Sequence, residues 1–166
     1  MIRQHPLSKA YGLTWPRPAL LTYPPDAPTA LALLLALPVW LALGLLWGPH
    51  LRTPVGWLAW ASLVLVQPLL EELVFRGQLQ GQALVWLVRH GQPIRLGPFT
   101  LANVLVTAAF VALHLRAQPL AWALAVAVPS LVFGQLRERF GSVWPAVLLH
   151  AYYNAGFGVT AWLTHH

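Results

Sequence analysis

The sequence lacks cysteine and carries very little charge. None of its 166 residues is cysteine, which excludes a disulfide framework, thiolate catalysis and any metal site built on cysteine. Only 8% of the residues are charged, against about 25% in soluble domains, so the chain does not fit an ordinary soluble domain. Any chemistry must come from His, Glu, Asp, Asn, Ser or Tyr side chains.

Apolar residues dominate what is present. They make up 58% of the chain, which excludes intrinsic disorder. A membrane span needs about 20 mainly apolar residues, and the length suits four or five. We predict an all-α, polytopic transmembrane helical bundle of about five spans, forming one transmembrane domain over residues 27–166 after a cytoplasmic or interfacial tail over 1–26. The predicted spans are 27–47, 57–79, 99–115, 119–136 and 143–162.

The basic residues indicate which way the chain lies in the membrane. The net charge of +6 comes from single residues scattered between apolar runs, a pattern that favours anionic lipid over nucleic acid as the partner. Lys and Arg concentrate in cytoplasmic loops. With five spans and a cytoplasmic N-terminus, seven basic residues fall inside and two outside. Those inside are Arg3, Lys9, Arg17, Arg89, Arg95, Arg137 and Arg139, and those outside are Arg52 and Arg116. We expect an integral protein of a bacterial inner membrane, without a cleaved signal peptide because the first 26 residues have no compact apolar core.

Two adjacent glutamates interrupt the second apolar run. Glu71 and Glu72 are followed by Arg76, and an ionisable group within a span is costly unless something compensates it. Glu72 and Arg76 are four residues apart and share a helix face, so they can form an ion pair. Glu71 points about 100° away and needs a different partner.

Two histidines and an asparagine lie within other apolar runs. His114 follows Phe110 by four residues and should pack beside it, and His150 shares a helix face with Asn154. Taken singly, each polar group has a plain structural explanation. The Glu–Arg pair can stabilise its own helix, each histidine can be a hydrogen-bonded interior residue, and the asparagine can hydrogen-bond to a neighbouring helix. Together, polar groups on three spans reach hydrogen-bond partners at the lowest cost in free energy when they face one another inside the bundle. The sequence therefore predicts a polar site within the membrane.

These residues resemble the motifs of the CPBP intramembrane proteases, the family of CAAX prenyl proteases and bacteriocin-processing proteins also called Abi. Residues 71–76 resemble its EExxxR motif, 110–114 its FxxxH motif and 150–154 its HxxxN motif. The resemblance covers about residues 57–158. It implies an endopeptidase that cuts a membrane-associated protein or lipopeptide tail, from prenylated carboxyl termini to bacteriocin precursors and bacterial sorting tails.

The resemblance also implies roles for individual residues. Glu71 and His114 would hold and deprotonate a water molecule, and His150 and Asn154 would form an oxyanion hole. Glu72 and Arg76 would be a structural pair and Phe110 a packing residue, although spacing alone leaves open which glutamate is the base. No cofactor is then needed. The rival mechanism is a metalloprotease in which Glu71, His114 and His150 ligate zinc, but asparagine is a poor zinc ligand and a good oxyanion donor.

Two other functions fit the same polar residues. A transporter or proton relay also places Glu and His within spans, but it predicts internal repeats and broken helices, and the sequence shows no repeat. A non-catalytic membrane scaffold would use the cluster only to lock the bundle. One geometric difficulty accompanies the protease hypothesis. At 1.5 Å per residue, the predicted depths of His114 and His150 differ by roughly 12 Å.

Overall fold

The computed structural model describes residues 10–15, 27–92 and 94–166. Most of the predicted tail over 1–26, with Arg3, Lys9 and Arg17, lies outside the described residues. Contacts between Cα atoms divide the described chain into two units. One holds 10–15 and 71–147 without residue 93, and we call it the glutamate unit. The other holds 27–70 and 148–166, and we call it the asparagine unit.

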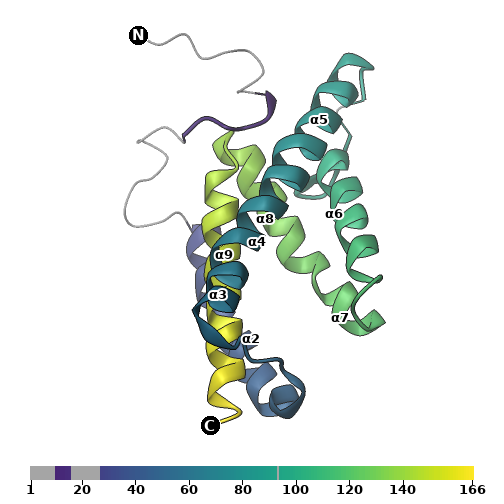
Figure 1. The fold of residues 1–166 in the computed structure, drawn as a ribbon. Coiled ribbons are helices and arrows are strands. Elements are labelled where there is room, and N and C mark those ends of the chain that lie inside the picture. The colour runs from purple at the N-terminus through teal and green to yellow at the C-terminus, as the bar shows by residue number, and fades with distance from the viewer. Residues whose placement is uncertain (1–9, 16–26, 93) are drawn as a thin grey trace. The chain divides into compact units, whose positions relative to one another are not determined.

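The described residues are almost entirely helical (Figure 1). In chain order the elements are α2 (Ala27–Trp47), the 3-10 turn η2 (Gly48–His50), α3 (Gly56–Ala61), the π-helical η3 (Ser62–Val66), α4 (Gln67–Glu72), the π-helical η4 (Leu73–Leu79), α5 (Gln80–Arg89), β1 (Arg95–Leu96), β2 (Phe99–Thr100), α6 (Leu101–His114), α7 (Leu120–Ala125), α8 (Ala127–Phe140) and α9 (Trp144–Leu163). The predicted all-α class is confirmed.

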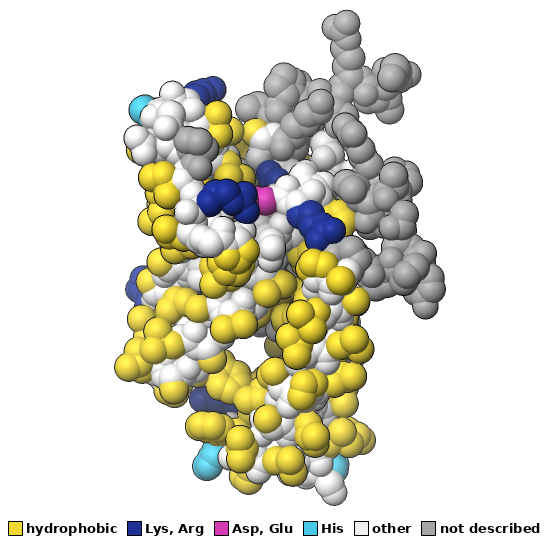
Figure 2. All heavy atoms as spheres, turned by 180° about the vertical axis from the view of Figure 1, so that it is seen from behind, with side chains coloured by type: hydrophobic (Ala, Val, Ile, Leu, Met, Phe, Trp, Pro, Cys, Tyr) yellow, Lys and Arg dark blue, Asp and Glu magenta, His cyan; other side chains and the backbone are white. Residues whose placement is uncertain are grey.

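Three helical stretches of the described chain are long and apolar enough to cross a membrane. They are Ala27–His50, Gly56–Arg89 and Leu120–Phe140, and Leu101–His114 is a shorter apolar helix. Yellow hydrophobic side chains cover most of the face seen in Figure 2, with few charged side chains between them. An apolar exterior of this kind suits lipid, and the chain is an integral membrane protein.

Several boundaries differ from the prediction for local reasons. The second helix continues ten residues beyond the predicted end at 79, to Arg89. The third begins at Leu101, because residues 95–100 form the small β1–β2 hairpin and the Thr100 side chain caps the helix by accepting from the Asn103 backbone N–H. The fourth predicted span consists of α7 and α8, which are separated at Val126.

The glutamate unit packs η4 and α5 against α6 and α8, with α7 beside both α6 and α8. Its apolar core consists of Phe75, Val106 and Phe110, with Val126 packed against them. Gly134 of α8 lies directly against the Asn103 side chain of α6, where an added methyl group would overlap it. Small residues of this kind let membrane helices approach closely.

Within the glutamate unit, residues 10–15 pack onto the helices. The Ala10 carbonyl accepts a hydrogen bond from Arg137 Nη2 at 2.7 Å, and the Gly12 carbonyl accepts one from the Val143 N–H at 2.9 Å. Gly81 of α5 lies so close to the Ala10 carbonyl that a side chain would overlap it. This part of the predicted tail is therefore tied to the helix that follows the glutamates.

In the asparagine unit, two tyrosines of α9 form hydrogen bonds to the backbone of α2. Tyr153 donates to the Ala32 carbonyl at 2.8 Å and Tyr152 to the Leu33 carbonyl at 3.3 Å. Gly156 leaves room for the Trp40 ring. These contacts place the Asn154 turn of α9 within a packed set of helices.

Candidate active site

The two glutamates stand where the long helix changes from α-helical to π-helical winding. Glu72 ends α4, and Arg76 lies in the seven-residue η4. Arg76 Nε donates to Glu72 Oε2 at 3.2 Å, and both side chains are fully buried. The predicted ion pair is confirmed. Glu71 is only partly buried, so the two neighbouring carboxylates occupy different environments. Local π-helical winding is frequent at functional sites.

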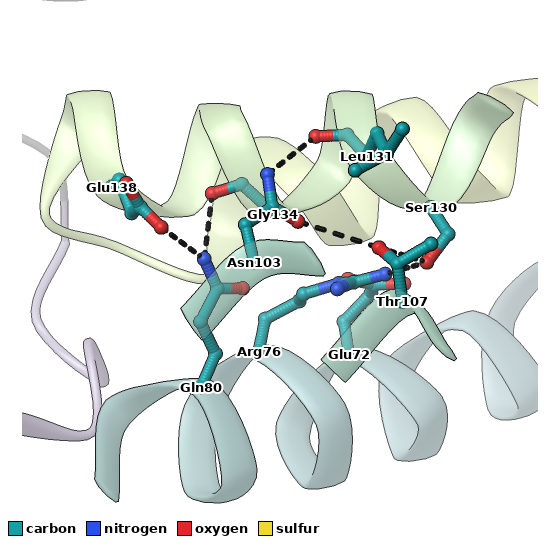
Figure 3. A network of polar contacts seen from close by, with 9 residues as sticks. All are labelled: Glu72, Arg76, Gln80, Asn103, Thr107, Ser130, Leu131, Gly134 and Glu138. Carbon is teal, nitrogen blue, oxygen red and sulfur yellow. Dashed lines mark hydrogen bonds and ion pairs between the residues drawn. The ribbon is translucent and has the colours of Figure 1, made fainter. Parts of the chain in front are cut away.

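Arg76 also begins a chain of hydrogen bonds that reaches two other helices (Figure 3). Its Nη2 donates to Ser130 Oγ of α8 at 2.6 Å, and that hydroxyl donates to Thr107 Oγ1 of α6 at 3.0 Å. Thr107 then donates to Asn103 Oδ1 at 3.4 Å, and Asn103 Nδ2 donates to the Leu131 carbonyl at 2.9 Å. The buried charge is therefore embedded in a polar network.

The remaining edge of the guanidinium faces an aromatic ring. Nη1 is buried without a hydrogen-bond partner among the described residues, and the Arg76 Cζ lies 5.8 Å from the centroid of the Phe110 ring. A cation over an aromatic face at this distance is attracted by the ring quadrupole. Phe110, expected to be a packing residue, thus also contacts the charge of the EExxxR motif.

A second branch of the network ties α5 to α8. The Gln80 amide, one turn beyond Arg76, donates to the Gly134 carbonyl at 3.0 Å and to Glu138 Oε1 at 2.7 Å. Thr100, at the start of α6, donates to the same carboxylate oxygen. Glu138, which lies between two predicted spans, is instead a residue of α8 that accepts from Gln80 of α5 (Figure 3) and from Thr100 of β2.

His114 has a fixed ring orientation at the end of α6. Its Nδ1 lies 2.9 Å from the Phe110 carbonyl oxygen, and the two rings are 4.4 Å apart between centroids. A carbonyl can only accept, so Nδ1 carries the proton. In the neutral ring Nε2 is then the lone-pair nitrogen, free to act as base or ligand. The predicted packing of Phe110 beside His114 is confirmed.

Asn154 has a defined backbone partner in the asparagine unit. Its Nδ2 donates to the Leu63 carbonyl at 2.9 Å. That carbonyl lies in η3, where the Gln67 N–H bonds to the Ser62 carbonyl instead. The next candidate donor along the helix is residue 68, a proline without an N–H. Proline and π-helical winding together leave the Leu63 oxygen available to orient the asparagine amide.

The motif residues are divided between the two units. Glu71, Glu72, Arg76, Phe110 and His114 belong to the glutamate unit, and His150 and Asn154 belong to the asparagine unit. His150 is buried, with 8% of its surface exposed, and lies one turn before Asn154 on α9. The Glu72–Arg76 and Phe110–His114 pairs expected from spacing are found in the glutamate unit. The meeting of all four groups in one pocket stays a prediction.

The sequence analysis missed the uncharged members of the network. They are Gln80, Asn103, Thr107 and Ser130. The sequence held a signal for some of them, because Arg76 and Gln80, like Asn103 and Thr107, are polar pairs four residues apart in apolar helices.

Neither unit, as far as it is described, gathers three His, Asp or Glu side chains around a point where a metal ion would bind. Zinc ligation by Glu71, His114 and His150 therefore stays an alternative for experiment to decide. The lone-pair nitrogen of His114 suits either water activation or metal ligation.

Comparison with known proteins agrees with the motifs. No curated protein and no solved structure gives a match to the chain. A family model described as type II CAAX prenyl endopeptidase Rce1-like matches residues 53–156, a stretch that contains all three motifs. The match covers more than half of the sequence and confirms the resemblance to CPBP proteases. The chain therefore belongs to the type II CAAX prenyl endopeptidase Rce1-like family.

Proposed function

We propose that this protein is an intramembrane endopeptidase in which Glu71 activates water to cut the tail of a membrane-associated protein or lipopeptide. Membership in an endopeptidase family and the apolar helices support the general activity. The choice of glutamate rests on one observation. Glu72 is fully buried and bonded to Arg76, whereas its neighbour Glu71 is partly exposed, as a carboxylate that binds a water molecule must be.

The proposed reaction needs a base, a proton carrier and oxyanion donors. Glu71 takes a proton from water as the water oxygen bonds to the scissile carbonyl carbon. The same proton then passes to the leaving amine as the C–N bond breaks. His114 would hold the water through Nε2, since its Nδ1 is occupied by the Phe110 carbonyl. Charge balances throughout, and no other reactant is required.

The oxyanion would be stabilised by His150 and Asn154. An asparagine amide has two N–H donors. One is directed to the Leu63 carbonyl, which fixes the plane of the amide and leaves the second N–H for the substrate oxygen. A donor held in place before the reaction stabilises developing charge more effectively than a mobile one.

The decisive experiment compares Glu71→Gln with wild type. Both proteins are expressed in the same cells, and new peptide N-termini in the membrane fraction are identified by mass spectrometry. We expect termini that are present with wild type and absent with Glu71→Gln, while both proteins insert to equal levels. A transporter or scaffold would give the same termini with both proteins, which would refute the proposal.

The metal alternative has its own test. Purified protein is assayed for bound zinc, and cleavage is measured after chelator treatment and after zinc is added back. The glutamate mechanism predicts cleavage that survives the chelator. Loss of cleavage restored by zinc, together with one zinc per chain, would establish the metalloprotease mechanism.

We further propose that the protein resides in a bacterial inner membrane with a cytoplasmic N-terminus. The excess of basic residues in alternate loops supports this orientation.

A further inference from the structure

We propose that Ser130 and Thr107 are positioning residues that act through Arg76 on the motif glutamates. The inference rests on the proposed function, because it assigns these hydroxyls a part in preparing the catalytic carboxylate. Ser130 is fully buried and Thr107 is 6% exposed. Neither belongs to the three motifs, and both come from helices other than the one that bears the glutamates.

The direction of every hydrogen bond in this chain is determined. A guanidinium has donors only, so Ser130 Oγ must accept from Arg76 Nη2. The single hydroxyl hydrogen of Ser130 is then directed to Thr107 Oγ1. Thr107 passes its own hydrogen to Asn103 Oδ1, and the Asn103 amide ends the chain on a backbone carbonyl. In such a chain each hydrogen bond polarises the next, so removing one member weakens the remaining bonds.

The chain holds the guanidinium at a second nitrogen, next to the one that binds the carboxylate. Glu72 binds Nε at 3.2 Å and Ser130 binds Nη2 at 2.6 Å. Without Ser130, Nη2 would lose its acceptor in a buried site, and the guanidinium would turn to recover one. The Glu72 carboxylate would follow, because the two groups are bonded to each other.

Glu71 precedes Glu72 directly in the same turn, so a shift of the backbone at Glu72 would alter the direction of the Glu71 side chain. A displacement of about 1 Å at a reacting group can reduce the rate roughly 100-fold. Ser130 and Thr107 are buried and would not touch the substrate. Their loss should therefore lower kcat and leave KM unchanged.

The test uses Ser130→Ala and the nearly isosteric Thr107→Val. Thr107→Ser keeps the hydroxyl and is the conservative variant. Ser142→Ala is the matched control, because Ser142 is fully buried in the same unit and accepts from the Trp144 backbone N–H, outside this chain. For each variant, kcat and KM per folded molecule are measured in detergent with a fluorescence-quenched peptide. The peptide spans a cleavage site found in the Glu71→Gln comparison. The thermal midpoint is recorded in parallel.

We expect kcat to fall at least tenfold in Ser130→Ala and Thr107→Val, with KM within twofold of wild type. Thr107→Ser should stay within threefold of wild type in kcat. Ser142→Ala should lower the thermal midpoint without changing kcat. If Ser130→Ala and Thr107→Val lower the midpoint but retain kcat, the hydroxyls are structural only and the inference is wrong. That result would leave the proposed function intact, whereas the same new termini with wild type and with Glu71→Gln would refute the function itself.

Discussion

Arg76 shows at the scale of one residue how a charge is accommodated inside an apolar helix. Its guanidinium meets a carboxylate, a hydroxyl and an aromatic ring, and it is fully buried. The i, i+4 spacing was enough to predict the carboxylate. It could not predict Ser130, which lies 54 residues away along the chain. Removing one member of a buried pair is costlier than replacing both, because the survivor keeps an uncompensated charge.

Arg76→Met should lower the free energy of unfolding by about 3–5 kcal/mol, because it leaves the Glu72 carboxylate buried without its cation. The double variant Glu72→Met with Arg76→Met should recover part of that loss. Both effects can be measured by unfolding the purified protein with increasing denaturing detergent. A double variant that is less stable than Arg76→Met would contradict this account of the pair.

The long helix Gly56–Arg89 is the element on which the site depends most. Its winding changes to π-helical twice, over Ser62–Val66 and Leu73–Leu79. Pro68 lies between the two stretches. The change in winding before it leaves the Leu63 carbonyl as the acceptor for Asn154. The proline thus leaves the Leu63 carbonyl available as an acceptor for Asn154, a motif residue 91 positions from Leu63 in the sequence.

Pro68→Ala should weaken catalysis through Asn154. The new N–H can bond to the Leu63 carbonyl and compete with the asparagine amide. Removal of one oxyanion donor typically costs about 100- to 1,000-fold in kcat, and we expect Pro68→Ala to show part of that loss, about tenfold. In an Asn154→Ala background the same change should have no further effect. Pro38→Ala is the control, since it removes another proline from a helix of the same unit. Additive losses would show that Pro68 acts independently of Asn154.

The close approach of residues 10–15 to α5 gives a second prediction for this element. Gly81→Val should displace these residues, because the added side chain overlaps the Ala10 carbonyl. Limited chymotrypsin digestion should then cut faster after Tyr11. Gln82→Val places the same side chain at an exposed position of the same helix and should leave the cleavage rate unchanged. Equal rates in all three proteins would mean that Gly81 does not hold this segment.

At the scale of the whole molecule, the apolar surface and the basic loops determine how the chain lies in a membrane. The absence of cysteine makes the predicted orientation simple to test, because any introduced thiol is unique. Gln92 and Gln118 are both exposed and lie at opposite ends of α6. In the predicted topology they lie on opposite sides of the membrane.

In intact cells, Gln118→Cys should react with a membrane-impermeant maleimide and Gln92→Cys should not. Both should react after the membrane is permeabilised, which serves as the control for accessibility. The expectation follows from the excess of Lys and Arg in the loops assigned to the cytoplasm. Labelling of Gln92→Cys alone in intact cells would show that the topology is the reverse of the predicted one.

The sequence by itself determined the features that depend on neighbours along the chain. Long uncharged runs fixed the all-α membrane class, and four-residue spacing fixed the pairs Glu72–Arg76 and Phe110–His114, because such contacts need only one helix turn. The order of the motifs identified the family. Only the tertiary structure revealed the partners that complete each site, Ser130 for Arg76 and the Leu63 carbonyl for Asn154. Those partners are distant in sequence, and a serine or a backbone carbonyl acquires its role only when helix packing brings a buried donor within hydrogen-bonding distance.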